Sequence, residues 1–355
     1  MRAILAGGGT GGHVIPALAI AQELTARFGE RPVFVGTDRG IETRLVPAAG
    51  FELHLIAVGQ LKSVSLATRL ATLAGLPRAV FQSLRILRQV RPQVVIGMGG
   101  YASGPVMLAA ALAGVPTVAF ESNFVPGFAN RRMAPFVQAA AVQFEETARY
   151  FRRAEVTGVP VRPEFFDLPP RPPDAPPSLL VFGGSQGARA LNRVVLDCLP
   201  ALSQALPGLR IVHQTGERDY NDAQAAYAAS AVSAVVTPFI EGMAQAFGGA
   251  DLLLCRSGAS TVAEIAAAGK AAILVPFPRA TDDHQRRNAE ALVRQGAAEM
   301  ILEADLTPER LLRTVAGLLG DRARLHAMGA AARRLAHRDA ARAIVELAAR
   351  AAGVQ

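Results

Sequence analysis

The sequence lacks tryptophan and has little cysteine or tyrosine. Of its 355 residues, none is Trp, two are Cys and four are Tyr. Cys198 and Cys255 form no CxxC pair and no Cys/His cluster. Their pattern excludes a disulfide framework or a structural zinc site and favours a reducing compartment. Proteins often stack nucleic-acid bases on aromatic side chains, so we expect no nucleic-acid partner.

Long hydrophobic runs and an export signal are also missing. The longest uncharged stretch, residues 92–120, is long enough to span a bilayer, but five glycines and three prolines divide it into a strand, a loop, a helix and a second strand. At the N-terminus only residues 3–6 are apolar before a glycine run. That segment is too short for a secretory signal, so we expect no export.

The residues that are abundant are apolar or basic. Hydrophobic residues make up 51% and charged residues 19% of the chain, which suits a globular protein and excludes a disordered or fibrous one. The formal charge is +8: residues 1–160 hold 16 Lys and Arg against 9 Asp and Glu, whereas residues 161–355 hold 21 against 20. This excess is able to attract an anionic substrate or membrane surface, although a general arginine bias also explains it.

The length predicts two domains. Prolines crowd residues 161–178, which we interpret as a linker. On either side, short apolar runs alternate with longer amphipathic ones, the pattern of βα units on a parallel sheet. We therefore predict an α/β protein with two doubly wound Rossmann-like domains, residues 1–160 and 179–335, and a C-terminal helix in residues 336–355 that packs back on the first domain.

The two predicted domains resemble each other. Residues 3–24 and 179–199 each contain an apolar run, a Gly-rich turn and a helical pattern, and residues 94–119 similarly match residues 252–275. In sheets of this kind ligands bind beyond the carboxyl ends of the strands. We expect the two domains to face each other across a cleft that holds the site, with the linker as its hinge.

The first Gly-rich turn permits two interpretations. Gly7, Gly9 and Gly12 fit G-x-G-x-x-G after a strand, where glycines allow a tight turn and helix-start N–H groups face a phosphate. A dinucleotide site also needs an acidic residue about 20 positions further on, and Asp38 lies 26 residues past Gly12. The motif alone therefore supports a nicotinamide or flavin enzyme only weakly.

His13 follows this turn. We predict that it lies in the first turn of a helix, because Pro16 suits a helix start. The positive end of the helix dipole disfavours an imidazolium, so a neutral His13 is able to accept a proton as a general base. Packing of the loop, or a hydrogen bond to phosphate, is the alternative role.

The second half repeats the anion-binding pattern in residues 183–187, GGSQG. Ser185 adds a hydroxyl donor and Arg162 a positive charge for a phosphoryl group, and the structural alternative is a tight turn with Ser185 as a helix cap. Thr261 and Glu264 have capping-box spacing. Glu264 also lies in an otherwise apolar run, where its carboxylate is able to accept both hydroxyls of a ribose.

Two further segments carry polar or basic patterns. Residues 281–285, TDDHQ, are either a helix cap or a source of amide and imidazole groups for a sugar. The chain has no D-x-D motif, so we predict no obligatory metal ligand and no cofactor. Residues 61–91 interleave basic and apolar residues in two predicted helices divided by Pro77. Such helices lie on an anionic membrane or cover a sheet.

Six motifs in one order nearly span the chain: GGTGGHVIPALAIA, GMGGYASGP, GVPVRPEF, GGSQGARALN, RSGASTVAEIAAAG and DDHQRRNA. With them the chain resembles the MurG-type peptidoglycan N-acetylglucosaminyltransferases. The resemblance implies a GT-B fold and inverting transfer of N-acetylglucosamine (GlcNAc) from UDP-GlcNAc to the N-acetylmuramic acid (MurNAc) 4-hydroxyl of lipid I, undecaprenyl-pyrophosphoryl-MurNAc-pentapeptide. The products are lipid II and UDP. It also implies a peripheral place at the cytoplasmic face of the cell membrane and contacts with other cell-wall synthesis proteins.

The resemblance also implies the residues that contact the donor. They are Thr10, Gly11, Gly12, Asn123, Arg162, Ser185, Ile240, Ala259, Ser260, Thr261, Val262, Ala263, Glu264 and Gln285. Among them, the Ile240 backbone is expected to bind uracil, Glu264 the ribose and Ser185 the diphosphate. Gln285 and Asn123 are expected to bind the sugar.

On the acceptor side, the matching residues are His13, Tyr101 and Glu121. His13 is the first candidate for the general base and Glu121 the second. The chain departs from the family pattern locally, and we expect altered packing there; the departures are Phe120, Ser122 and Val159. The alternative functions are another UDP-sugar enzyme, such as a UDP-GlcNAc 2-epimerase or a glycolipid glycosyltransferase, and a non-catalytic nucleotide-sugar-binding protein.

Overall fold

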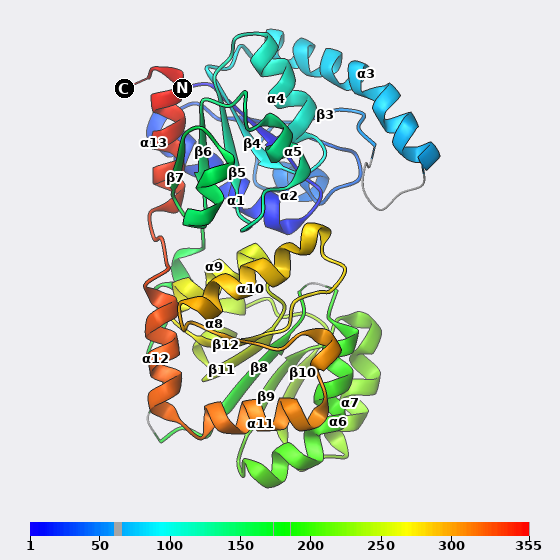
Figure 1. The fold of residues 1–355 in the computed structure, drawn as a ribbon, viewed down its shortest axis with the longest axis vertical. Coiled ribbons are helices and arrows are strands. Elements are labelled where there is room, and N and C mark those ends of the chain that lie inside the picture. The colour runs from blue at the N-terminus through cyan, green and yellow to red at the C-terminus, as the bar shows by residue number, and fades with distance from the viewer. Residues whose placement is uncertain (60–65, 173, 185, 355) are drawn as a thin grey trace. The chain divides into compact units, whose positions relative to one another are not determined.

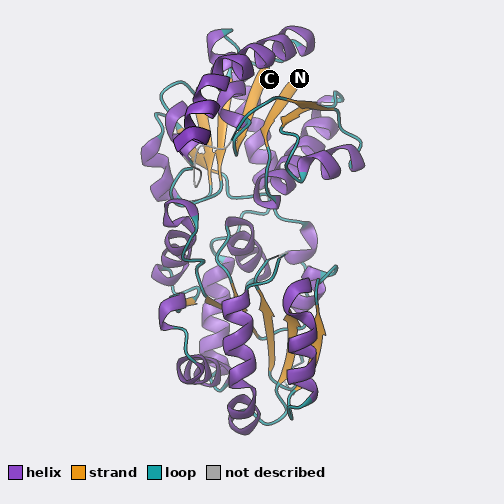
Figure 2. Cartoon of the chain, turned by 90° about the vertical axis from the view of Figure 1, so that its right-hand side faces the viewer, coloured by secondary structure: helices purple, strands orange, loops and turns teal. Residues whose placement is uncertain are grey.

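The computed structural model describes residues 1–59, 66–172, 174–184 and 186–354 and divides into two units. The first unit comprises Met1–Pro160 and Asp339–Gln355, and the second comprises Val161–Arg338. Each unit contains one parallel sheet with helices on both faces (Figures 1 and 2). In the part of the chain that the structure describes, no helix has the length and apolar character needed to cross a membrane.

The sheet of the first unit has the strand order β3-β2-β1-β4-β5-β6-β7. Its strands are β1 (Ala3–Gly7), β2 (Val33–Gly36), β3 (Leu53–Leu55), β4 (Val94–Gly99), β5 (Thr117–Glu121), β6 (Ala139–Val142) and β7 (Ala154–Val156). All residues of β4, β5 and β6 are buried, as expected for parallel strands covered on both faces. Uninterrupted apolar runs in the sequence therefore become the centre of this sheet.

The helices of the first unit flank that sheet. They are α1 (Gly11–Phe28), α2 (Glu42–Ala48), α3 (Leu66–Val90), α4 (Ser103–Leu112), α5 (Phe128–Met133), α13 (Ala340–Ala352) and the 3-10 helix η1 (Glu145–Tyr150). The prediction that Pro77 divides residues 61–91 into two helices is wrong, because α3 continues through Pro77. A proline inside a helix removes one backbone hydrogen bond, and a long helix tolerates that loss when the rest of it packs well.

Helix α13 lies in the first unit although it is separated from β7 by the whole second unit. It packs on α1 and against β4, β5 and β6, and buries Ile344 and Val345. Ion pairs join it to α1 and to β7: Arg27 lies 3.3 Å from Glu346, and Arg350 lies 2.6 Å from Glu155. Both chain ends are therefore beside the same sheet (Figure 1).

The sheet of the second unit has the order β10-β9-β8-β11-β12-β13. Its strands are β8 (Ser178–Phe182), β9 (Arg210–Gln214), β10 (Ser233–Thr237), β11 (Leu252–Cys255), β12 (Ala271–Leu274) and β13 (Glu299–Met300). Its helices are α6 (Arg189–Ala205), α7 (Tyr220–Ala228), α8 (Met243–Gly248), α9 (Ala259–Ala268), α10 (His284–Arg294), α11 (Pro308–Leu319) and α12 (Arg322–Arg333). Short 3-10 helices are η2 (Pro163–Phe165), η3 (Glu217–Asp219), η4 (Thr281–Asp283) and η5 (Glu303–Asp305).

The proline-rich segment expected to be a linker lies against the second unit. Phe165 is fully buried and meets Phe247 edge to face, with ring centroids 5.1 Å apart. Phe182 at the end of β8 also packs against Phe247, with ring centroids 5.6 Å apart. Aromatic burial of this kind joins the segment to the centre of the sheet.

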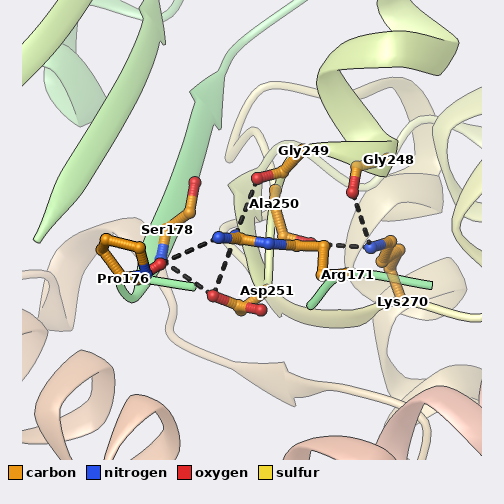
Figure 3. Close-up of polar contacts among 8 residues, drawn as sticks. All are labelled: Arg171, Pro176, Ser178, Gly248, Gly249, Ala250, Asp251 and Lys270. Carbon is orange, nitrogen blue, oxygen red and sulfur yellow. Dashed lines mark hydrogen bonds and ion pairs between the residues drawn. The ribbon is translucent and has the colours of Figure 1, made fainter. Parts of the chain in front are cut away.

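Arg171 holds the same segment through polar contacts (Figure 3). Its guanidinium donates to the carbonyl oxygen of Gly249 at 2.8 Å, to Asp251 Oδ2 at 2.9 Å and to the carbonyl oxygen of Pro176 at 2.8 Å. Asp251 Oδ2 also accepts from the Ser178 N–H at 2.9 Å, where β8 begins. One half-buried ion pair thus connects the segment, β8 and the start of β11.

Lys270 supports the loop before β11 from the other side (Figure 3). Its ammonium donates to the carbonyl oxygen of Ala250 at 2.7 Å and to that of Gly248 at 3.4 Å. Burial lowers the pKa of Lys270, and the nearby Asp251 opposes that shift. These contacts lie at the amino ends of β11 and β12, which leaves the carboxyl ends of the strands for a ligand.

Candidate active site

The predicted acceptor-side residues come together at one edge of the first sheet. Strands β1, β4 and β5 are neighbours in the sheet. His13 is in the helix that follows β1, Tyr101 is in the turn after β4, and Glu121 is the last residue of β5. Parallel strands present their carboxyl ends at the same edge, which is where ligands bind in such sheets. Tyr101 is 41% exposed there.

His13 lies in the first turn of α1, as predicted. Thr10 is the N-cap, and its carbonyl oxygen accepts the N–H groups of His13 at 3.1 Å and Val14 at 3.2 Å. The half-buried His13 ring lies so close to Gly99 that a Cβ there would stand 2.9 Å from His13 Cε1. Gly99 has a φ of +88°, so the β4–α4 loop passes the imidazole at a position that only glycine suits.

A carboxylate that the sequence motifs did not reveal binds the Gly-rich loop between β1 and α1. Glu42, the first residue of α2, is 1% exposed. It accepts the N–H of Gly9 at 2.8 Å and both the N–H and the hydroxyl of Thr37 at 3.0 Å. A Cβ at Gly8 would stand 2.1 Å from Glu42 Oε1. The glycines of the first turn therefore make room for this carboxylate.

Glu121 has both carboxylate oxygens in use. It is 3% exposed at the end of β5. Oε1 accepts the backbone N–H and the side-chain amide of Asn123 at 2.9 and 3.2 Å. Oε2 accepts the Gly127 N–H and the Asn130 amide, each at 2.9 Å. These contacts indicate that Glu121 shapes the loop after β5.

The departures from the family pattern are all in the interior of the first unit. Phe120 is 1% exposed, and Ser122 and Val159 are each 3% exposed. Their burial agrees with altered packing at these positions.

The predicted donor residues of the second unit lie beyond the carboxyl ends of the strands in its own sheet. Ile240 lies between β10 and α8, residues 259–264 begin α9, and Gln285 is in the first turn of α10. Arg162 precedes η2 and, with Glu241 and Met243, lines a cavity of about 340 Å³. Ser185 lies outside the residues that the structure describes, and the N-cap of α6 is Ala188.

The start of α9 differs from the predicted capping box. Gly258 is the N-cap, and no side chain caps the helix, so Thr261 and Glu264 do not form the reciprocal bonds. The Ser257 hydroxyl instead donates to the carbonyl oxygen of Gln285 at 2.8 Å, which joins the starts of α9 and α10. Among the described residues, the buried hydroxyl of Ser260 has no hydrogen-bond partner.

Glu264 is left with acceptor capacity. It is half-buried on α9, and desolvation raises its pKa to about 7, while the positive charge of Arg162 opposes the shift. A carboxylate that titrates near neutral pH beside the carboxyl ends of the strands is typical of a functional site.

Gln285 is oriented by the backbone. Its side-chain oxygen accepts the Phe277 N–H at 3.0 Å. The N–H donors of the same amide therefore face away from Phe277 N. Asp282 and Asp283, just before α10, have φ values of +54° and +55°. Two consecutive non-glycine residues in the left-handed region store strain, which is common at binding loops.

Comparisons with known proteins give the class. Residues 3–142 match the glycosyltransferase family 28 N-terminal domain and residues 178–344 the glycosyltransferase family 28 C-terminal domain. The chain is therefore a family 28 glycosyltransferase with the GT-B fold. UDP-GlcNAc 2-epimerase from Neisseria meningitidis shares the fold alone, with a TM-score of 0.69 and 14% identity over 98% of this chain and 99% of that one.

Closer relatives narrow the family. The UDP-N-acetylglucosamine--N-acetylmuramyl-(pentapeptide) pyrophosphoryl-undecaprenol N-acetylglucosamine transferase of Solibacter usitatus is 46% identical over 346 residues, 97% of this chain and 94% of the relative. The protein of the same name from Anaeromyxobacter sp. (strain Fw109-5) is 47% identical over 354 residues, 98% and 93% of the two chains. Acinetobacter baumannii MurG has a TM-score of 0.85 at 35% identity, covering 98% and 99%. The chain belongs to the MurG family.

The contacts of Glu121 predict a cost in stability when it is changed. Glu121→Gln replaces an acceptor oxygen with an amide, which leaves a buried N–H donor without its acceptor. We expect the free energy of unfolding of the first unit to fall by about 1–3 kcal/mol, measured by hydrogen exchange of its amides in urea.

Glu155→Gln is the matched control, because Glu155 is 52% exposed and pairs only at the surface with Arg350. Its loss should stay below about 1 kcal/mol. Equal losses in the two variants would contradict a loop-shaping role for Glu121.

Proposed function

We propose that this chain transfers GlcNAc from UDP-GlcNAc to the MurNAc 4-hydroxyl of lipid I, with inversion, and releases lipid II and UDP. Full-length identity of 46–47% to transferases of that name is the observation that carries the proposal. The positions of the predicted residues support the proposal. In both units these residues lie near the carboxyl ends of the strands, where parallel sheets of this kind bind ligands.

The second unit binds the donor in this proposal. The Ile240 backbone contacts uracil, and the Glu264 carboxylate accepts the two ribose hydroxyls. The start of α6 with Ser185, together with Arg162, binds the diphosphate, whose negative charge grows as UDP departs. The proximity of Arg162 and Glu264 supports their place in one donor site.

The first unit binds the acceptor and supplies the base. His13 takes the proton from the MurNAc 4-hydroxyl as that oxygen attacks the anomeric carbon. Glu121 keeps the loop after β5 in shape, and Asn123 in that loop contacts the sugar together with Gln285. The two occupied oxygens of Glu121 support this division of roles.

The first unit also meets the membrane in this proposal, at the cytoplasmic face. Exposed apolar residues lie on the neighbouring helices α3, α4 and α5 or directly after them; they are Phe81, Leu112, Phe128 and Phe136, from 39% to 69% exposed. Arginines adjoin them: Arg85 lies over the Phe81 ring at 4.5 Å and Arg132 over the Phe128 ring at 5.3 Å. Apolar side chains with flanking arginines suit an anionic lipid surface.

A transferase assay tests the reaction and the base together. UDP release from UDP-GlcNAc should require a lipid I analogue, and mass spectrometry should find one added N-acetylhexosamine on the lipid. His13→Ala should lower kcat about 10²- to 10⁴-fold with folding unchanged. Donor binding without turnover would contradict the transferase, and near-full turnover of His13→Ala would contradict the base.

Donor affinity should depend on pH through Glu264. Only the carboxylate accepts both ribose hydroxyls, so affinity is full above pH 7 and falls as protonation proceeds below it. We expect UDP-GlcNAc to bind about tenfold more weakly at pH 6 than at pH 8 by calorimetry. Glu264→Gln should bind more weakly and without that slope; a persisting slope would assign the titration to another group.

Membrane attachment should depend on the basic face of α3. Replacing Arg78, Arg85 and Arg88 with Glu should reduce sedimentation with anionic vesicles, most strongly at low salt. The control makes the same charge change in the three arginines just before β7, Arg149, Arg152 and Arg153. Equal effects of the two sets of substitutions would show that net charge alone explains the attachment, and would contradict a specific role for α3.

A further inference from the structure

Strand β9 ends in polar residues that are buried. His213 is fully buried, and Gln214 and the following Thr215 are each 1% exposed. Polar side chains in such places need hydrogen-bond partners. Strand β9 pairs with β8, so that Gln214 lies beside Phe182, the last residue before the glycine loop of residues 183–187.

Two kinds of contact join the end of β9 to that loop. The Gln214 side-chain amide donates to the carbonyl oxygen of Gly184 at 2.8 Å. Gly187, with a φ of +72°, lies so close that a Cβ there would stand 1.9 Å from the carbonyl oxygen of Thr215. Gly187 therefore lies directly against the backbone of Thr215, after β9.

Asn192, on the first turn of α6, holds that backbone in place. Its side-chain amide donates to the carbonyl oxygen of Thr215 and to Asp219 Oδ2, each at 2.8 Å. Both partners are oxygens that accept, so the orientation of the Asn192 amide is determined. Its oxygen must then face His213 Nε2, at 3.1 Å.

This orientation determines the tautomer of His213. Nε2 must carry the proton and donate to Asn192, so Nδ1 accepts from the Tyr227 hydroxyl at 3.0 Å. Burial lowers the pKa of His213 to about 4, so that the ring is neutral at physiological pH. Both ring nitrogens of His213 therefore have a hydrogen-bond partner, and the imidazole holds Asn192 and Tyr227 at a fixed separation.

We propose that Gln214, with the Asn192–His213 pair behind it, is a positioning residue for the diphosphate of the UDP-sugar. The inference rests on the proposed function and adds residues to its donor site. Gln214 holds Gly184, and Asn192 links the start of α6 to Thr215, on which Gly187 rests. Donor N–H groups held in place before binding need no reorganisation when negative charge develops.

The test compares two ligands that differ only in the diphosphate. Gln214→Met keeps the length of the side chain and removes its N–H donor. We expect affinity for UDP to fall about tenfold, whereas affinity for uridine, measured by the same titration, stays within about twofold. A purely structural role would weaken both ligands alike.

Lys270→Met is the matched control, since Lys270 also donates to buried carbonyl oxygens in the second unit, but at the amino ends of the strands. It should leave the ratio of UDP to uridine affinity unchanged. Asn192→Leu is a second variant that acts on the same loop through Thr215, and it should lower that ratio as Gln214→Met does.

The outcomes separate the two claims. Equal losses for UDP and uridine, or no loss in folded Gln214→Met and Asn192→Leu, would overturn the positioning role and leave the proposed function intact. Failure of the unaltered chain to bind either ligand would overturn the proposed function and the inference with it.

Discussion

A glycine has no side chain with which to anchor a loop, and in each Gly-rich loop at the start of a domain a buried polar side chain from a neighbouring element binds a glycine's backbone. In the first unit Glu42 accepts the N–H of Gly9. In the second unit Gln214 donates to the carbonyl oxygen of Gly184. Each contact fixes a peptide group shortly before a helix, and the start of a helix is where N–H groups are available to a ligand. Both loops are thus held by a residue from outside the loop.

Three acidic side chains illustrate how surroundings decide chemistry. Glu42 and Glu121 are nearly inaccessible, and each accepts several N–H or O–H groups of its own unit. Glu264 lies in a less polar place, and its pKa of about 7 reflects desolvation. A carboxylate that accepts no hydrogen bond from the described residues is the one that gains most from two hydroxyls of a ligand.

The sequence was sufficient for the architecture and for the family, whereas the predicted ligand contacts stay predictions. Alternating apolar runs and Gly-rich turns predict two parallel sheets, and the six motifs identify the family; both are confirmed. The residues that hold the loops from behind escaped prediction. Glu42 acts on a residue 33 positions away and Gln214 on one 30 positions away. Gln214 is near Gly184 because β9 pairs with β8, and Glu42 is near Gly9 because α2 follows β2, which pairs with β1. No local pattern records these pairings.

Local signals also failed where tertiary contacts outweighed them. Pro77 is a helix breaker by propensity, yet α3 continues through it. The Thr261 and Glu264 spacing resembles a capping box, but the neighbouring Ser257 hydroxyl binds the carbonyl oxygen of Gln285 and α9 starts from Gly258. The proline pattern of residues 161–178 also gave no sign that Phe165 and Arg171 have partners in the second unit.

The position of α13 has a consequence for how the chain is made. Because α13 completes the first unit only after residues 161–338 have been synthesised, the apolar side of α1 and the sheet behind it stay uncovered while the second unit emerges from the ribosome. The second unit is continuous in sequence and has all its strands by then. Vectorial synthesis therefore favours an order in which the later half of the molecule matures first.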